Sequence, residues 1–318
     1  MRYFIVHAHH EPRSFSGALT THAREKLFAA GHEVVVSDLN AMHFDPVSDR
    51  RNFTTLADAH YLKQQAEEQY ASQHDGFAPD VEREIRKLES CDVLVFQFPL
   101  WWFGMPAILK GWCDRVLAMG RVYGGGKWYE HGIGAGRPAI VSMTTGGPPP
   151  MYGSAGLNPQ LTGILAPIHH GVFWFNGFRP AAPFITWGVS RQDAGQRAAR
   201  LERWGDCLLN IGERPALPHL PASTFSEGGI GIDIMPRYMV SWTRTRGDEG
   251  REDRERAAIT RLRGEGVVLD AWDATHGGRG GFVARAESPE ALRERLEASE
   301  LGGAMEFVID QLQISEPE

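Results

Sequence analysis

The chain has 318 residues, of which 42% are hydrophobic and 23% charged, with a formal net charge of −7 at pH 7. This length predicts two domains, and the hydrophobic fraction is ample for a buried core. The negative charge, which no basic run offsets, argues against nucleic acid or an anionic membrane as the main partner. The first apolar run is too short for a signal peptide and no run is long enough to span a bilayer, so we expect a cytoplasmic protein.

The cysteines stand far apart in the sequence, at Cys91, Cys113 and Cys207, and form no CxxC pair. This spacing argues against a zinc site, a dithiol redox centre or a disulfide framework. It is typical of a protein from a reducing compartment. We therefore expect no metal site.

Strands and helices alternate from the N-terminus. Tyr3 to Ala8 is a short apolar run typical of a buried strand, and a helix is predicted from Phe15 to Ala30. A second strand follows from Glu33 to Ser37, which completes a βαβ unit with parallel strands. The long polar segment after it predicts a helix over 55–72.

The alternation continues as far as a proline-rich stretch at 215–221. Helices are predicted at 79–88, 106–119, 164–177 and 192–211, and strands at 91–98, 138–144 and 184–187. The pattern predicts an α/β fold with an open, doubly wound parallel sheet. Ligands bind such sheets beyond the C-terminal ends of the strands.

A second domain is predicted over 235–318. Its elements are expected as strand 237–243, helix 251–263, strands 267–274 and 281–286, helix 289–298 and strand 305–312. The order βαββαβ is the ferredoxin-like arrangement of a small α+β domain. Asp270, Asp273 and His276 are interpreted as ordinary residues, because no pattern focuses them on a pocket. We expect this domain to strengthen oligomerisation or to narrow the entrance to a site in the first domain.

The first candidate binding loop, 9–16, reads HHEPRSFS and directly precedes a helix. A helix N-terminus presents unpaired N–H groups and partial positive charge, so it stabilises an anion. Ser14 and Ser16 can add hydroxyl donors, and His9 can add another. The alternative is an ordinary N-capped helix, and the sequence favours neither interpretation.

Two more loops follow predicted strands. Residues 99–106, PLWWFGMP, are unusually aromatic, and a flat apolar heterocycle could bury against them while backbone amides bind its polar edge. Residues 144–152, TTGGPPPMY, contain adjacent glycines that let the backbone approach a ligand closely. A core aromatic cluster and a simple turn are the respective alternatives.

The chain up to about Phe225 resembles the NAD(P)H:quinone oxidoreductases of the DT-diaphorase type. The matching stretches are SF at 14–15, SDL at 37–39, FQFPL at 96–100, WFG at 102–104, PAILKGW at 106–112, TTGG at 144–147, MY at 151–152 and LE at 201–202. The resemblance implies a flavodoxin-like domain over 1–225 that binds FAD rather than FMN. It also implies a homodimer with the site between subunits.

The resemblance also assigns residues. Those that match flavin-binding positions are His9, Ser14, Phe15, Ser16, Pro99, Leu100, Trp101, Trp102, Phe103, Thr144, Thr145, Gly146, Gly147 and Arg197. The first loop would hold the pyrophosphate, the second the isoalloxazine ring and the third its pyrimidine edge, with Arg197 near the adenine. Tyr152 matches a tyrosine that steadies the charge of the reduced ring.

The chain departs from the family at several of these positions. Asn158 stands where the family has a catalytic histidine, and Asn can donate a hydrogen bond but cannot become charged. His169 or His170 could substitute for it, although a helix-borne pair is more often structural. Trp101 replaces a glutamine, and Arg13 and Ser16 replace a more usual Thr and Asn. Tyr123 is kept but is followed by three glycines, which predicts a wider or more mobile acceptor pocket.

The implied activity is NAD(P)H-dependent reduction of a quinone-like acceptor by two electrons. Hydride transfer through FAD would be ping-pong, with Tyr152 and Asn158 stabilising the charge that develops on the ring. A nitro- or azo-reductase is an alternative within the enzyme class. A regulatory flavoprotein subunit of a potassium-efflux system is the alternative from another class.

Overall fold

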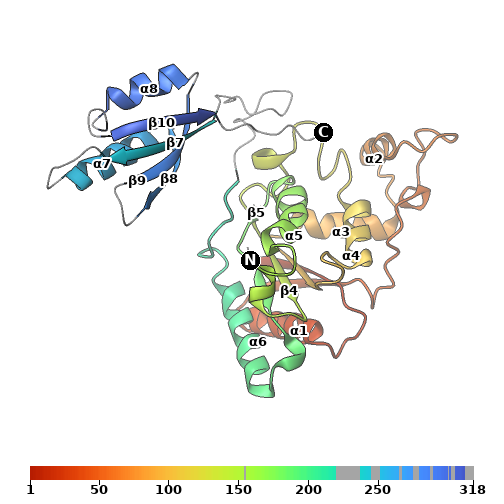
Figure 1. The fold of residues 1–318 in the computed structure, drawn as a ribbon. Coiled ribbons are helices and arrows are strands. Elements are labelled where there is room, and N and C mark those ends of the chain that lie inside the picture. Colours follow the sequence, from red (N-terminus) through yellow and green to blue (C-terminus); the bar gives the residue numbers. More distant parts are fainter. Residues whose placement is uncertain are drawn as a thin grey trace. The chain divides into compact units, whose positions relative to one another are not determined.

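A computed structural model describes residues 1–153, 155–219, 237–244, 251–264, 267–274, 279–286, 289–299, 301 and 305–311. The chain divides into two compact units, Met1–Ala222 and Ser223–Glu318 (Figure 1). Within the described residues, no helix is both long and apolar enough to cross a membrane.

A parallel sheet forms the centre of the first unit, with the strand order β2-β1-β3-β4-β5 and with β6 also paired to β4. Its strands are β1 (Arg2–His7), β2 (Glu33–Asp38), β3 (Val93–Pro99), β4 (Pro138–Thr144), β5 (Arg179–Pro180) and β6 (Phe184–Thr186). This is the flavodoxin-like strand order, in which β1 and β3 flank the point where the winding reverses. The predicted α/β class with a doubly wound parallel sheet is confirmed.

Helices cover both faces of this sheet (Figure 1). On one face, α1 (Phe15–Ala29) and α6 (Ala194–Leu209) enclose a core that includes Leu19 and Trp204. On the other, α3 (Pro79–Ser90), α4 (Ala107–Val116) and α5 (Leu161–Ile168) enclose a second core. All seven residues of β3 are buried, as expected for a central strand covered on both sides.

The predicted helix over 55–72 is wrong in its first half, because α2 begins only at Gln64 (Gln64–Gln73). The Glu67 carboxylate accepts hydrogen bonds from the backbone N–H groups of Ala57 and Asp58, at 2.7 and 2.9 Å. These N–H groups are held by a buried side chain from the helix, so the preceding chain stays irregular. A short 3₁₀ helix, η1 (Arg50–Asn52), lies before it.

The single helix predicted over 164–177 is two segments in the structure. The α5 helix begins earlier, at Leu161, and ends at Ile168, where the π-helical segment η4 (His169–Trp174) takes over. Pro167 lies inside α5 and has no N–H to donate, so the regular hydrogen-bond ladder is interrupted there. The π-helical turn that follows is wider than an α-helical turn and changes the spacing of the side chains. The apolar periodicity of the sequence did not reveal this change.

The second unit contains, in chain order, β7 (Arg237–Arg244), α7 (Arg251–Gly264), β8 (Val268–Ala274), β9 (Arg279–Arg285), α8 (Pro289–Glu297) and β10 (Met305–Gln311). Its four strands pair antiparallel in the order β10-β7-β9-β8. Buried residues such as Phe282, Leu262 and Leu292 form its core. His276 lies outside the described residues, as do the side chains of Asp270 and Asp273.

Candidate functional site

Three loops meet at the C-terminal ends of β1, β3 and β4. The backbone N–H of Leu100 donates to the carbonyl oxygen of Thr144 at 2.9 Å, and the hydroxyls of Ser16 and Thr144 lie 3.2 Å apart. The ring of His9 lies 5.8 Å from that of Trp101, centroid to centroid. The structure thus brings together the three loops that the sequence singled out. We call this region the three-loop edge (residues 9–16, 99–104 and 144–147).

The first loop ends in a capped helix. The side chain of Ser14 accepts a hydrogen bond from the N–H of Gly17 at 3.1 Å, which makes Ser14 the N-cap of α1. The helix is therefore N-capped, and the cap leaves the Ser14 hydroxyl proton free to be donated, so capping and anion binding are compatible. The N–H groups of Phe15 and Ser16, in the first turn, have no acceptor within the helix. Such groups, at the positive end of the helix dipole, suit a phosphate.

His9 is arranged as a neutral donor. Its Nδ1 accepts a hydrogen bond from the N–H of Glu11 at 3.0 Å, so its proton is on Nε2. Partial burial lowers the pKa of His9, and the neighbouring His10 lowers it further. At neutral pH this side chain therefore offers an N–H rather than a positive charge.

The second loop is a tight turn in an uncommon conformation. Trp101 and Gly104 exchange backbone hydrogen bonds of 3.2 and 3.0 Å, while Trp102 and Phe103 between them have φ values of +51° and +56°. Two left-handed residues in succession define a type I′ turn, a geometry that normally selects Asn, Asp or Gly. Bulky residues held there are strained, and such strain is concentrated at functional sites.

This turn leaves the Trp102 side chain 98% exposed and that of Phe103 47% exposed. Among the described residues, the N–H groups of Trp102 and Phe103 have no backbone or side-chain acceptor. A ring that packed on these side chains could accept hydrogen bonds from the same turn. The alternative of a core aromatic cluster is wrong for Trp102.

The third loop is anchored to the sheet. Thr145 is buried, its N–H donates to the carbonyl of Thr186 at 2.9 Å, and its hydroxyl donates to that of Gly147 at 2.8 Å. A Cβ on Gly147 would lie 3.1 Å from the Tyr152 ring, so the glycine permits that contact. A Cβ on Gly146 would meet nothing within 4 Å, so the backbone there faces open space.

Tyr152 and Asn158 lie at the two ends of the segment that follows. Tyr152 ends the 3₁₀ helix η3 (Pro149–Tyr152), and its ring packs 5.3 Å from that of Trp187. The N–H of Asn158 donates to the carbonyl of Met151 at 2.9 Å, which holds Asn158 next to this helix. Both side chains are half-buried.

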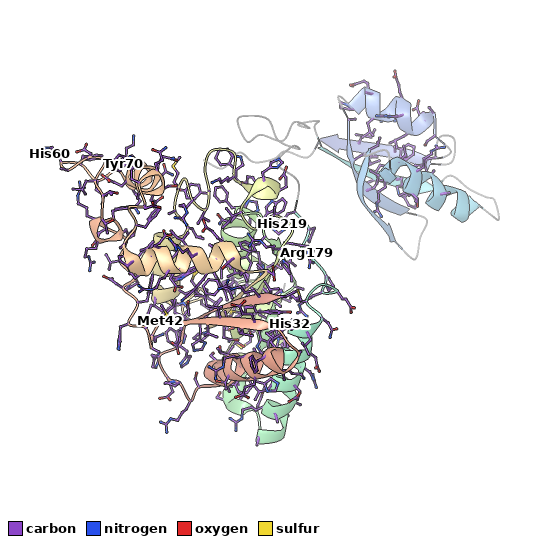
Figure 2. All side chains as sticks on the ribbon, turned by 180° about the vertical axis from the view of Figure 1, so that it is seen from behind. His32, Met42, His60, Tyr70, Arg179 and His219 are labelled. Atoms are coloured by element: carbon purple, nitrogen blue, oxygen red, sulfur yellow. The ribbon has the colours of Figure 1, made fainter. Side chains whose placement is uncertain are left out.

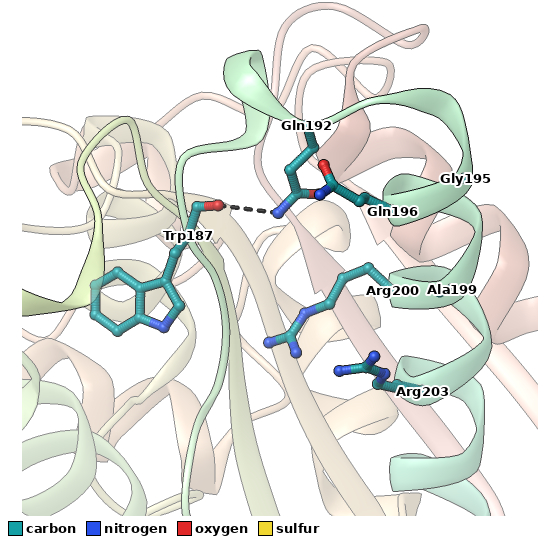
Figure 3. A pocket seen from close by; sticks show the side chains of 7 residues that line it. All are labelled: Trp187, Gln192, Gly195, Gln196, Ala199, Arg200 and Arg203. Carbon is teal, nitrogen blue, oxygen red and sulfur yellow. Dashed lines mark hydrogen bonds between the residues drawn. The ribbon is translucent and has the colours of Figure 1, made fainter.

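A pocket of about 490 Å³ continues from Trp187 along α6 (Figure 3). The Nε2 of Gln192 donates to the carbonyl of Trp187 at 3.0 Å, and Arg200 and Arg203 extend from the helix. Arg197 is exposed on the same helix but does not line the pocket.

Sequence reasoning missed Arg200, which is more firmly fixed than Arg197. Its guanidinium lies 3.8 Å from the centroid of the Phe184 ring, donates to the Thr186 hydroxyl at 3.3 Å and contacts the Ile185 carbonyl. Arg200 lies about one helical turn after Arg197 and so on the same side of the helix, which could have indicated it as a further candidate residue.

A row of buried polar side chains crosses the sheet near the strand ends that lead into the three-loop edge. His7 and Gln97 are aligned on β1 and β3, and Gln97 and Ser142 on β3 and β4. The Nδ1 of His7 bonds to the hydroxyl of Thr20 at 2.9 Å, and burial lowers the pKa of His7. Gln97 and Ser142 have no side-chain hydrogen-bond partner in the described structure. Sequence reasoning did not single out Gln97 either, although a polar glutamine within the apolar run VLVFQFP could have indicated it.

Tyr123, expected near the acceptor pocket, and the histidine pair His169 and His170 lie outside the three-loop edge. Tyr123 accepts a hydrogen bond from Gln65 at 3.3 Å, and the three glycines after it all have positive φ. His169 and His170 line a cavity to which no residue of the three-loop edge contributes. Their substitution for the family's catalytic histidine stays a prediction.

The fold and this edge define a flavodoxin-like protein, and comparison with known families agrees. The family model that matches is described as a flavodoxin-like fold, and it covers residues 1–208. The match ends before the second unit begins.

Relatives narrow the class. The chain is 39% identical over 225 residues to NAD(P)H dehydrogenase (quinone) 1 of Cavia porcellus, across 70% of this chain and 82% of that protein. It is 36% identical over 218 residues to ribosyldihydronicotinamide dehydrogenase (quinone) of Pongo abelii, across 68% and 94%. A solved structure assigned as a quinone reductase from Klebsiella pneumoniae has a TM-score of 0.70 at 32% identity, across 74% and 95%. The chain belongs to the flavodoxin-like NAD(P)H:quinone oxidoreductase family, as its motifs predicted, and is an oxidoreductase.

Proposed function

We propose that this protein is an NAD(P)H-dependent flavoprotein that reduces quinones or similar acceptors by two electrons in a ping-pong reaction, with FAD as its cofactor. The observation that carries the proposal is the three-loop edge. There an anion-binding helix start, an exposed aromatic turn with free amides and a glycine loop that faces open space are linked by hydrogen bonds. A nucleotide with a flat ring and phosphates needs these three features together.

The residues present fit a flavin. The first turn of α1, with Ser14, Ser16 and His9, would hold the phosphates. The turn at Trp102 and Phe103 would pack against the ring, and the backbone of 145–147 would bind its polar edge. A bound flavin would supply hydride acceptance and donation, chemistry that no amino-acid side chain provides.

Tyr152 and Asn158 would act by hydrogen bonding. A tyrosine hydroxyl and an asparagine amide can each donate to an oxygen on which negative charge develops, and this kind of stabilisation contributes strongly to catalysis. Because Asn158 has no titratable proton, we infer that charge is neutralised here by hydrogen bonds without uptake of a proton by this residue.

FAD is favoured over FMN because the chain continues to offer binding surface beyond the phosphates. The pocket beside α6 and the exposed Arg197 provide room and a planar cation for an adenosine group. We also propose a homodimer. The support is the resemblance, which implies a site between two subunits, and a cavity of about 480 Å³ with a largely apolar lining beside Phe175 and the gating residue Tyr123.

The test begins with the absorption spectrum of the purified protein, followed by chromatography of the released flavin. We expect a yellow protein that releases FAD and oxidises NAD(P)H steadily with a simple benzoquinone. A colourless protein that binds neither FAD nor FMN would contradict the proposal. Negligible turnover with specific binding to a membrane channel would instead support the regulatory alternative, and faster turnover with nitro or azo compounds would identify a different acceptor class.

We further propose that 235–318 is a separate ferredoxin-like domain that strengthens the dimer. The support is its element order and its own core, which packs α7 and α8 against the sheet. On β10, Phe307 is buried while Val308 is 59% exposed, so the other sheet face carries an apolar group. Truncation at Phe225 tests this role by sedimentation, and an unchanged dimerisation constant would refute it.

A further inference from the structure

A second cavity, of about 230 Å³, lies in the first unit. Leu161, Leu165 and Ala166 of α5 form one side, together with His169 and His170 of the π-helical turn. Proline and leucine side chains and His219 form the other side. None of the lining residues belongs to the three-loop edge, and none has a part in the proposed reaction. We call it the histidine cavity.

The second wall is held in place by the sheet. The N–H of Leu217 donates to the carbonyl of Pro180 at 2.8 Å, and Ala216 pairs with Ala181 in an isolated bridge. His219, labelled in Figure 2, bonds through Nδ1 to the carbonyl of Leu217 at 3.0 Å. A carbonyl oxygen only accepts, so Nδ1 is the donor and Nε2 of a neutral His219 is an acceptor.

His169 is the polar group that this cavity leaves without a partner. The residue is 7% exposed, and its ring Nε2 is buried without a hydrogen-bond partner among the described residues. Burial lowers the pKa of His169 to about 4, and the nearby His219 contributes to the shift. A buried polar group without a partner is costly in a protein interior and calls for a bound molecule or another explanation.

The backbone at His169 is also specialised. The N–H of Phe175 donates to the carbonyl of His170 at 2.9 Å, five residues back, and the π-helical turn begins directly after Pro167. Short π-helical turns within α-helices are frequent at functional sites. Leu161, Leu165 and His169 are spaced by four residues, so His169 and His170 continue the cavity-lining face of α5, and the wider turn begins with them.

We propose that the histidine cavity binds a small uncharged aromatic molecule with one hydroxyl group, its ring between the leucine and proline side chains and its hydroxyl bonded to His169. A buried apolar cavity of roughly 150 Å³ accommodates benzene, so this larger one has room for a ring with small substituents. The apolar walls favour the ring, and a neutral imidazole satisfies one hydroxyl without requiring a charged ligand.

The test is calorimetric titration of the full-length, flavin-saturated protein with phenol, toluene and benzoate. Because an aromatic probe could also stack on the bound flavin, binding is assigned to the cavity through the variants described below, and the titration gives an answer even if the protein has no reductase activity. We expect phenol to bind about tenfold more tightly than toluene or benzoate, the difference that one hydrogen bond makes. Equal binding of phenol and toluene, preference for benzoate, or no binding of phenol would overturn the proposal.

Two variants locate the ligand. His169→Leu keeps an apolar wall, so toluene should still bind while the preference for phenol is lost. Ala166→Phe, at an exposed lining position, should abolish binding of both. Gly163→Phe on the same helix, where a Cβ would meet nothing within 4 Å, is the matched control and should bind phenol normally. Unchanged phenol binding by both cavity variants would refute the assignment.

Discussion

The three-loop edge and the histidine cavity are built in opposite ways. At the edge, short loops at strand ends present backbone amides, and one of the two tryptophans, Trp102, is almost fully exposed. In the cavity, side chains from α5, from the π-helical turn and from the chain at 217–219 form the walls, and the buried Nε2 of His169 has no partner among the described residues. Ligand binding by backbone amides depends on the conformation of the loop, whereas ligand binding by side chains depends on which residues are present. Substitutions at the three-loop edge and at the histidine cavity should therefore have different effects.

The largest effect is expected from Trp102→Pro. Proline fixes φ near −65°, which is incompatible with the φ of +51° at this position, and it removes an N–H. Flavin affinity should fall by at least a hundredfold, or about 3 kcal/mol. Trp102→Gly, which adopts positive φ freely, should lose only the ring contact, about tenfold. Flavin fluorescence titration measures both, and equal losses would show that the turn conformation is unimportant.

A pH effect of similar size is expected at His169. Its pKa in the folded protein is lowered from 6.5 to about 4, so the folded state resists protonation that the unfolded chain accepts. The stabilisation is complete above pH 6.5 and is lost as the pH falls from 6.5 through 4. One pKa unit corresponds to about 1.4 kcal/mol, so up to about 3 kcal/mol is at stake.

Chemical denaturation at pH 7 and pH 4 measures this loss. His169→Leu has no such proton to bind, so its free energy of unfolding should fall less between these pH values than that of the parent protein. An identical pH dependence in the two proteins would contradict the assignment to His169.

Gly146→Ala should separate binding from stability. A Cβ at this position meets no protein atom within 4 Å, so the free energy of unfolding without flavin should hardly change. Flavin affinity should nevertheless fall about tenfold, because the methyl group would occupy space that the ligand approaches. Gly163→Ala, which is equally unobstructed but lies on α5, should leave flavin affinity unchanged and raise the free energy of unfolding by about 0.5–1 kcal/mol, because Ala is favoured over Gly within a helix. Unaltered flavin affinity in Gly146→Ala would place the ligand elsewhere.

The smallest effect is expected at Arg197, which is exposed and outside the pocket beside α6. Arg197→Ala should weaken FAD about threefold, or about 0.6 kcal/mol, as for a solvent-screened contact. FMN has no adenosine group, so its affinity should not change. Competition between the two flavins measures the ratio, and equal weakening of both would argue against an adenine contact.

Most of the fold could be predicted because its signals are local. Apolar runs such as VLVFQFP and the helix cap at Ser14 each specify their own segment, and consecutive motifs marked all three loops. The rest depends on contacts distant in sequence. The histidine cavity needs a wall contributed by His219, some fifty residues after His169 along the chain. The irregular segment before α2 needs the Glu67 carboxylate, which no propensity reveals.

The bridge between Ala216 and Ala181 covers the edge of the parallel sheet at β5. The β5 strand has only two residues and is the last strand of the order, so the chain at 215–217 covers an otherwise open edge. Uncovered strand edges recruit strands from other molecules and promote aggregation. A fragment that stopped before Arg214 would therefore be prone to precipitate, whereas one that retained the chain through His219 would keep its edge shielded.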